Sequence, residues 1–106
     1  MSRRKGELTP AGVDHGWPHQ VAILASLCTG KQGDVHAEFC KGLSLCVRGH
    51  SVVWEDDWYN VKCFALREDA EAFMARFGGE WFDPREKGKR DEWFMWRKGT
   101  VRKRMI

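Results

Sequence analysis

The clearest pattern in the chain is a helical stripe of apolar residues across positions 66–77. Its members recur every three or four residues: Leu66, Ala70, Phe73, Met74 and Phe77. Acidic residues crowd the first turn and Arg76 stands in the last, which is the arrangement that the helix dipole favours. Gly78 and Gly79 follow, and glycine readily adopts the left-handed conformation that ends a helix. The pattern therefore predicts one amphipathic helix over these residues.

Two runs of β-branched and aromatic residues, 51–54 and 59–66, lie before this helix. The acidic segment 55–57 joins them, so we expect a β-hairpin. The second run places Tyr59, Val61, Cys63 and Ala65 on one face and Trp58, Asn60, Lys62 and Phe64 on the other. We expect the first face to form the core, because burial of Asn60 and Lys62 would be costly.

Three further segments complete the expected fold. The near-continuous apolar run 19–28 predicts a buried strand, and residues 34–41 predict a helix that ends at Gly42. Residues 80–83 predict a last short strand before Pro84. The order strand, helix, strand, strand, helix, strand is that of the ferredoxin-like βαββαβ fold, in the α+β class. We therefore expect a four-stranded antiparallel sheet with two helices on one face.

This ferredoxin-like domain would occupy residues 19–84, between two basic ends. Residues 1–18 would form an N-terminal basic arm, in which a threonine–proline pair suits the start of one helical turn. Residues 85–106 would form a basic, tryptophan-rich C-terminal extension. We expect its aromatic run, 93–96, to cover an edge of the sheet or its open face.

The formal net charge of +3 conceals a segregation of charge along the chain. Residues 1–5 carry +3 and residues 85–106 carry +6, whereas the segment 6–84 carries −6. Two explanations remain open. The basic ends either fold back on the acidic body or form an electrostatic arm for nucleic acid or an acidic partner.

Length and composition set the broad class. The 106 residues, of which 42% are hydrophobic, suit one globular domain. No apolar stretch is long enough to span a bilayer and no apolar secretory segment follows the basic start, so we expect a cytoplasmic protein without membrane contact. Its four cysteines would then be reduced thiols or metal ligands. The glycine-containing segment 30–33 lacks the P-loop consensus, so no nucleotide site is expected.

Four residues have the chemistry of a metal site: His36, Cys40, Cys46 and His50. In a helix His36 and Cys40 lie one turn apart, and two sulfur and two nitrogen donors suit tetrahedral zinc. The spacing of Cys40 and Cys46 fits no standard zinc knuckle, so we expect buried thiols and no bound cofactor. A Cys46 nucleophile with His50 as its base is the enzymatic alternative. No third member of such a set is identifiable, and we expect no catalysis.

Six tryptophans interleaved with cations indicate a binding surface. In proteins that bind single strands, aromatic rings stack on bases while cations follow the phosphates. Small domains also use tryptophan simply to gain buried area. The candidate residues for binding nucleic acid or another partner are Trp58, Lys62, Phe64, Lys89, Arg90, Trp93, Trp96, Arg97, Lys98, Arg102, Lys103 and Arg104.

Residues 61–71, VKCFALREDAE, resemble the third strand and second helix of RNA-recognition-motif domains. The spacing from Phe64 to Ala70 is the same, and Gly78 stands where those domains turn into their last strand. The resemblance implies a ferredoxin-like unit that stacks bases on outward-facing rings. In this chain it leaves only Tyr59 in a stacking position.

Across most of its length the chain is also similar to a family of short bacterial proteins without an assigned activity. The segments that carry the resemblance are MSRRKGELTP, GWPHQVA, FCKGLSLCVRGH and FGGEWFDP. The resemblance implies a compact cytoplasmic protein and carries nothing about its chemistry.

These features together predict a small non-catalytic binding module. We expect a partner protein rather than nucleic acid, in the manner of an accessory or inhibitory factor of bacterial or phage type. The alternatives are a nucleic-acid-binding domain that uses the basic ends and the aromatic rings, and a small zinc-binding protein. An unpaired sheet edge would also allow a homodimer.

Overall fold

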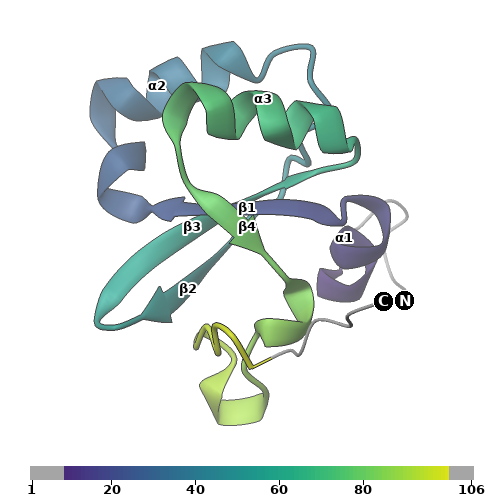
Figure 1. The fold of residues 1–106 in the computed structure, drawn as a ribbon, viewed down its shortest axis with the longest axis vertical. Helices are drawn as coiled ribbons and strands as arrows, with labels where there is room; N and C mark the ends of the chain where they lie inside the picture. The colour runs from purple at the N-terminus through teal and green to yellow at the C-terminus, as the bar shows by residue number, and fades with distance from the viewer. Residues whose placement is uncertain (1–8, 101–106) are drawn as a thin grey trace, which may run out of the picture.

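The computed structural model of the protein describes residues 9–100 as a mixed α+β fold (Figure 1). The helices are α1 (Pro10–Gly16), α2 (Gly30–Phe39) and α3 (Arg67–Phe77). The strands are β1 (His19–Leu24), β2 (His50–Trp54), β3 (Asp57–Phe64) and β4 (Glu80–Phe82). Short 3₁₀ turns lie at Ala25–Cys28, Pro84–Glu86 and Arg90–Glu92. No helix among the described residues combines the length and apolarity needed to cross a bilayer.

The four strands form one antiparallel sheet in the order β2-β3-β1-β4. At its centre Ala22 of β1 lies opposite Val61 of β3. The hairpin between β2 and β3 turns at Glu55 and Asp56, whose φ angles of 52° and 69° match the right-handed twist of the strands. The acidic hairpin turn predicted from the sequence is therefore present, with Asp57 already in β3.

Helix α3 begins after Leu66 and ends at Gly78, whose positive φ of 89° is one that glycine adopts without strain. Helix α2 differs from its prediction because it begins at Gly30, so the segment expected to be a loop forms its first turn. Gly33 suits that turn, since an added Cβ would lie only 2.4 Å from the carbonyl oxygen of Cys28. The preceding strand is correspondingly shorter than expected and ends at Leu24.

Helix α1 attaches part of the expected N-terminal arm to the sheet. Thr9 caps it, since the Thr9 hydroxyl accepts a hydrogen bond from the Gly12 amide over 3.0 Å. Val13 is 3% exposed and belongs to an apolar cluster with Val61 and Cys63 of β3. The first eight residues of the arm lie outside the described part of the chain.

Both faces of the sheet are covered, whereas the sequence predicted one core face and one open face. Helices α2 and α3 lie together on one side of the sheet (Figure 1), and the cluster on that side contains Phe64 and Phe73. The opposite face, which carries Val61 and Cys63, packs against α1 and Trp96. The alternation of side chains along β3 assigns residues to two faces correctly. Both faces are apolar at the C-terminal end of the strand, however, where Cys63 and Phe64 lie. The polarity of Asn60 and Lys62 therefore could not show which face the helices cover.

The C-terminal segment pairs with the outer edge of β2. The Val53 amide donates a hydrogen bond to the Phe94 carbonyl over 2.7 Å, and the Val53 carbonyl accepts one from the Trp96 amide over 2.8 Å. Trp96 is 2% exposed, with its ring centroid 5.3 Å from that of Phe82. These contacts position the residues that follow β4 against the face opposite α2 and α3.

Candidate functional site

The four candidate metal ligands lie in pairs on opposite faces of the sheet. His36 and Cys40 lie on the side of α2 and α3, where the His36 ring packs edge-on against phenylalanines of α3. Cys46 belongs to the cluster on the other face, and the His50 ring contacts Phe82 there. Within residues 9–100 no group of three or more His, Cys, Asp or Glu side chains is placed to hold a metal ion. The zinc alternative therefore has no assembled site.

The cysteine–histidine pair considered for catalysis is not assembled either. The His50 Nε2 atom lies 3.4 Å from Gln20 Oε1, and His50 Nδ1 is buried without a hydrogen-bond partner. Neither ring nitrogen is therefore hydrogen-bonded to the Cys46 thiol. Burial raises the pKa of the Cys63 thiol to about 12 and that of Cys40 above its ordinary value, so both stay neutral thiols at pH 7.

Three of the predicted binding residues do not lie on an open sheet face. Phe64 is fully buried beneath α3, and Trp96 is 2% exposed. Lys62 lies opposite Val21 on the face that the helices cover, and its charge lowers the pKa of His36 in α2, after burial. Phe64 and Trp96 therefore offer no ring to a partner, because α2 and α3 cover one face of the sheet and Trp96 helps to fill the other.

Two of the predicted aromatic residues remain exposed and lie close together. Trp58 is 50% exposed and Trp93 is 63% exposed. The half-buried ring of Phe94 joins them, with centroids 6.3 Å from Trp58 and 5.6 Å from Trp93. We call these three side chains the ring cluster. They meet because the pairing of the C-terminal segment with Val53 brings residues 93–96 beside the β2–β3 hairpin.

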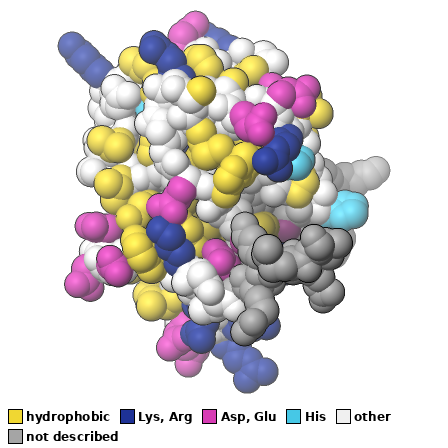
Figure 2. All heavy atoms as spheres, in the orientation of Figure 1, with side chains coloured by type: hydrophobic (Ala, Val, Ile, Leu, Met, Phe, Trp, Pro, Cys, Tyr) yellow, Lys and Arg dark blue, Asp and Glu magenta, His cyan; other side chains and the backbone are white. Residues whose placement is uncertain are grey.

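Most cations of the described C-terminal segment are paired with carboxylates. The ion pairs are Arg85–Asp83, Lys87–Asp14, Arg97–Glu92 and Lys98–Glu80. The Lys98 ammonium also lies 3.8 Å from the centroid of the Trp54 ring. Figure 2 shows cationic and anionic side chains interspersed on the face that it draws. Lys89 and Arg90 are exposed, and Arg102, Lys103 and Arg104 lie outside the described residues.

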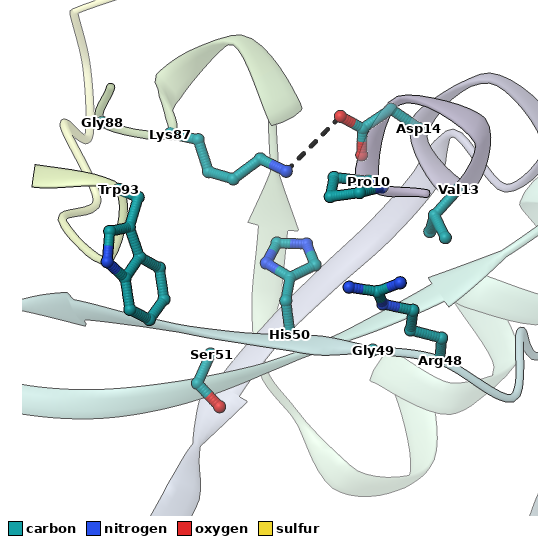
Figure 3. A pocket seen from close by; sticks show the side chains of 10 residues that line it. All are labelled: Pro10, Val13, Asp14, Arg48, Gly49, His50, Ser51, Lys87, Gly88 and Trp93. Atoms are coloured by element: carbon teal, nitrogen blue, oxygen red, sulfur yellow. Dashed lines mark ion pairs between the residues drawn. The ribbon is translucent and has the colours of Figure 1, made fainter. Parts of the chain in front are cut away.

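A cavity of about 310 Å³ opens beside the ring cluster, and we call it the Trp93 cavity. His50 and Ser51 line it from the start of β2, Arg48 from the chain just before that strand, and Lys87 from the segment after β4. The remaining lining residues are Pro10, Val13, Asp14, Gly49, Gly88 and Trp93. Figure 3 shows the His50 ring in the centre, the Lys87–Asp14 ion pair across it and Trp93 on one side.

A part-buried hydrogen-bond network fixes the tautomer of His50. The Gln20 amide nitrogen donates to Asp14 Oδ1 over 3.0 Å and to the Trp17 carbonyl over 3.1 Å. That orientation leaves Gln20 Oε1 as an acceptor, so His50 Nε2 carries the proton and Nδ1 carries a lone pair. Burial, and then the charge of Lys87, lower the pKa of His50 to about 4. The imidazole is therefore neutral at pH 7.

Sequence reasoning missed Asp14 and Gln20 as members of this site. Gln20 is fully buried in β1, and its position inside an otherwise apolar run was the one signal that could have identified it. Nothing in the sequence marks Asp14 in this way, because only the tertiary fold brings it next to its partners Gln20 and Lys87.

Comparison with known proteins finds no matching family model, no matching curated protein and no matching solved structure. The resemblances to RNA-recognition-motif domains and to the short bacterial family stay predictions. The function is therefore argued from the geometry and charge of the described residues.

Proposed function

We propose that the protein is a small non-catalytic binding module that recognises another protein through the ring cluster. The observation that carries the proposal is the exposure of Trp58 and Trp93, at 50% and 63%, on either side of Phe94. Large exposed rings that touch one another form an apolar patch, and tryptophan is enriched among the residues that dominate protein interfaces. The patch rests on a rigid base, since the β2–β3 hairpin and the backbone pairing at Val53 hold it.

The charges that adjoin the ring cluster favour a partner with cationic side chains. Glu55, Asp56 and Asp57 come directly before Trp58 in the hairpin turn, and all three are exposed. Asp91 and Glu92 come directly before Trp93, and the five carboxylates of these two segments outnumber the neighbouring cations Lys89 and Arg90. An arginine or lysine of the partner would find both carboxylates and ring faces here.

Nucleic acid is the second candidate, and two observations weaken it. Carboxylates adjoin both exposed tryptophans, and they would repel phosphate groups. Two of the candidate cations, Arg97 and Lys98, are paired with acidic side chains. Arg85 and Lys87, which belong to the same basic end, are paired with Asp83 and Asp14. These pairs support the alternative in which the basic C-terminal end neutralises the acidic body.

We further infer that the sheet is of the ferredoxin-like kind. The order β2-β3-β1-β4, with every neighbouring pair antiparallel, supports this assignment. A cytoplasmic location is part of the same proposal, because all four cysteines are free thiols.

Affinity capture from bacterial lysate, with and without nuclease, tests the proposal. The variants are a Trp58→Ser, Trp93→Ser double substitution and a matched Trp81→Ser control. Trp81 is 40% exposed but lies on β4, where Arg67 stacks on its ring. We expect a protein that wild type and the Trp81 control retain, that the double variant loses, and that nuclease leaves in place.

Two results of the capture experiment would contradict the proposal. Equal capture of the same protein by wild type and the double variant would remove the ring cluster as the binding surface. Capture that nuclease abolishes would favour the nucleic-acid alternative. That alternative would then require oligonucleotide affinity that falls steeply with salt, by roughly 0.7–0.9 log units per phosphate contact for each tenfold change in salt.

A further inference from the structure

The Trp93 cavity has the construction of a small-molecule site. Its volume of about 310 Å³ lies at the lower end of the range for ligand pockets, ~300–1,000 Å³. Three separate parts of the chain converge on it: α1, the start of β2 and the segment after β4. Pro10 and Val13 give it an apolar side, and the indole of Trp93 provides a flat wall.

The polar lining of the cavity is predominantly cationic. Arg48 and Lys87 contribute two positive charges, and Asp14 contributes one negative charge, 3.5 Å from the Lys87 ammonium. His50 stands between them with a neutral ring, because burial and the charge of Lys87 lower its pKa to about 4. Two cationic side chains and one carboxylate therefore line a mainly apolar hollow.

The electrostatic effect on His50 agrees with this count. After burial, the charge of Lys87 is the largest cause of its lowered pKa, Arg48 acts in the same direction, and only Asp14 opposes them. These are the charged groups that bear on the ring from α1, from the chain before β2 and from the segment after β4. A field that disfavours a proton on His50 favours an anion in the space beside it.

We propose that the Trp93 cavity binds a small organic carboxylate with a flat apolar body. The carboxylate would lie between the Arg48 guanidinium and the Lys87 ammonium, and the apolar body would pack between the Trp93 ring and Pro10. Arginine suits this role because its planar group donates paired hydrogen bonds to a carboxylate. The inference does not depend on a protein partner, although Trp93 belongs both to the cavity and to the ring cluster.

A titration of the full-length protein followed by ¹H–¹⁵N NMR tests the inference with three probes. Benzoate carries the charge and the ring, benzamide keeps the ring without the charge, and acetate keeps the charge without the ring. We expect benzoate to shift the amides of Gly49 and Gly88 and the indole signal of Trp93. We also expect it to bind about tenfold more tightly than either other probe.

Matched variants identify the charge that matters. Arg48→Gln should weaken benzoate binding about tenfold and leave benzamide unchanged. Arg85→Gln is the control, since Arg85 is 72% exposed and lies outside the cavity, and it should leave benzoate affinity unchanged. Trp93→Leu should weaken benzoate and benzamide together. The dispersed spectrum of each variant reports that it is folded.

The pKa of His50 provides a readout that a nonspecific salt effect would not reproduce. A carboxylate bound beside the ring should raise this pKa from about 4, and sodium chloride at equal ionic strength should not. The inference is overturned by equal affinity for benzoate and benzamide, or by an absence of benzoate shifts at millimolar concentration. Shifts confined to residues away from Gly49 and Gly88, or equal effects of Arg48→Gln and Arg85→Gln, would also overturn it.

Discussion

The indole Nε1 of Trp96 donates a hydrogen bond to the carboxylate of Glu86 over 3.0 Å. The second oxygen of the same carboxylate accepts from the Gly99 amide over 2.9 Å, and the Glu86 carbonyl accepts from the Arg97 amide over 2.8 Å. A glutamate just after β4 therefore fixes the segment that carries the last tryptophan. This segment forms part of the apolar cluster on the face opposite α2 and α3.

Trp96→Ala should be among the most destabilising single substitutions on that face. It removes a ring that is 2% exposed and leaves Glu86 without its indole donor, so we expect a loss of about 3–5 kcal/mol in the free energy of unfolding. Trp93→Ala is the matched control, because Trp93 is 63% exposed and should lose below about 1 kcal/mol. Urea unfolding measures both, and similar losses would contradict the burial of Trp96.

Phe73 should be the corresponding anchor beneath α3. Its ring is fully buried and lies 5.8 Å from that of Phe64 and 5.0 Å from that of Phe77. We expect Phe73→Ala to cost about 3–5 kcal/mol in urea unfolding. Ala72→Ser, one position earlier on the exposed side of the helix, should cost below about 0.5 kcal/mol. A loss under about 1 kcal/mol for Phe73→Ala would mean that a different face of α3 packs against the sheet.

Stability should fall on acidification through the titration of His50. Its pKa is about 4 in the folded protein and 6.5 when unperturbed, so the unfolded chain binds more protons between these values. The contribution of the neutral imidazole to the free energy of unfolding is therefore fully present above about pH 6.5, and it is lost as the pH falls toward 4. We expect this loss to reach about 1–3 kcal/mol.

The comparison of His50→Gln with His15→Gln isolates that effect. His15 is exposed, so His15→Gln controls for the loss of an imidazole at the surface. His50→Gln should flatten the dependence between about pH 6.5 and 4. Burial also lowers the pKa of His36, which leaves a residual slope of the same sign. An unchanged slope in His50→Gln would mean that the imidazole is not held neutral.

Lys98 should contribute stability that depends on salt. Its ammonium lies 2.7 Å from the Glu80 carboxylate and 3.8 Å from the centre of the Trp54 ring. We expect Lys98→Gln to cost about 0.5–1 kcal/mol at low salt and less at high salt, because mobile ions screen the pair. Lys31→Gln, at an exposed position in α2, should cost little at either salt concentration.

The C-terminal truncation extends this test to the residues outside the described range. Removal of residues 97–106 deletes Lys98 together with Arg97, Arg102, Lys103 and Arg104. If the basic end neutralises the acidic body, the truncation should lower stability at low salt and leave any oligonucleotide affinity unchanged. Salt-dependent affinity tighter than micromolar that disappears with the truncation would instead support nucleic-acid binding.

Local signals predicted the elements that depend on near neighbours. The stripe that ends at Phe77 and the two glycines after it define α3, and the acidic turn before Trp58 defines the hairpin. The same signals could not predict which face of the sheet α2 and α3 cover. That choice depends on whether Val61 or Phe64 meets the helices, and both are apolar and buried.

The candidate site was predicted less well, because its contacts join distant parts of the chain. His50 lies thirty positions from Gln20, and Lys87 lies far beyond Asp14 in the sequence. The exposure of the tryptophans could not be predicted either. Trp93 and Trp96 lie in the same aromatic run of the sequence, yet Trp93 is exposed and Trp96 is buried. The sequence shows which functional groups the chain carries, and only the fold determines which of those side chains are exposed to solvent.

The two hydrogen bonds at Val53 also determine how copies of the chain could polymerise. An antiparallel sheet grows by adding strands at free edges, and an assembly extends without limit only if both edges are available. The C-terminal segment already occupies the β2 edge at Val53, and within residues 9–100 no strand pairs with the outer edge of β4. Growth through β4 would stop after one round, because each joined copy would present a blocked edge. Release of the C-terminal segment would remove that block and expose the sheet to fibre growth.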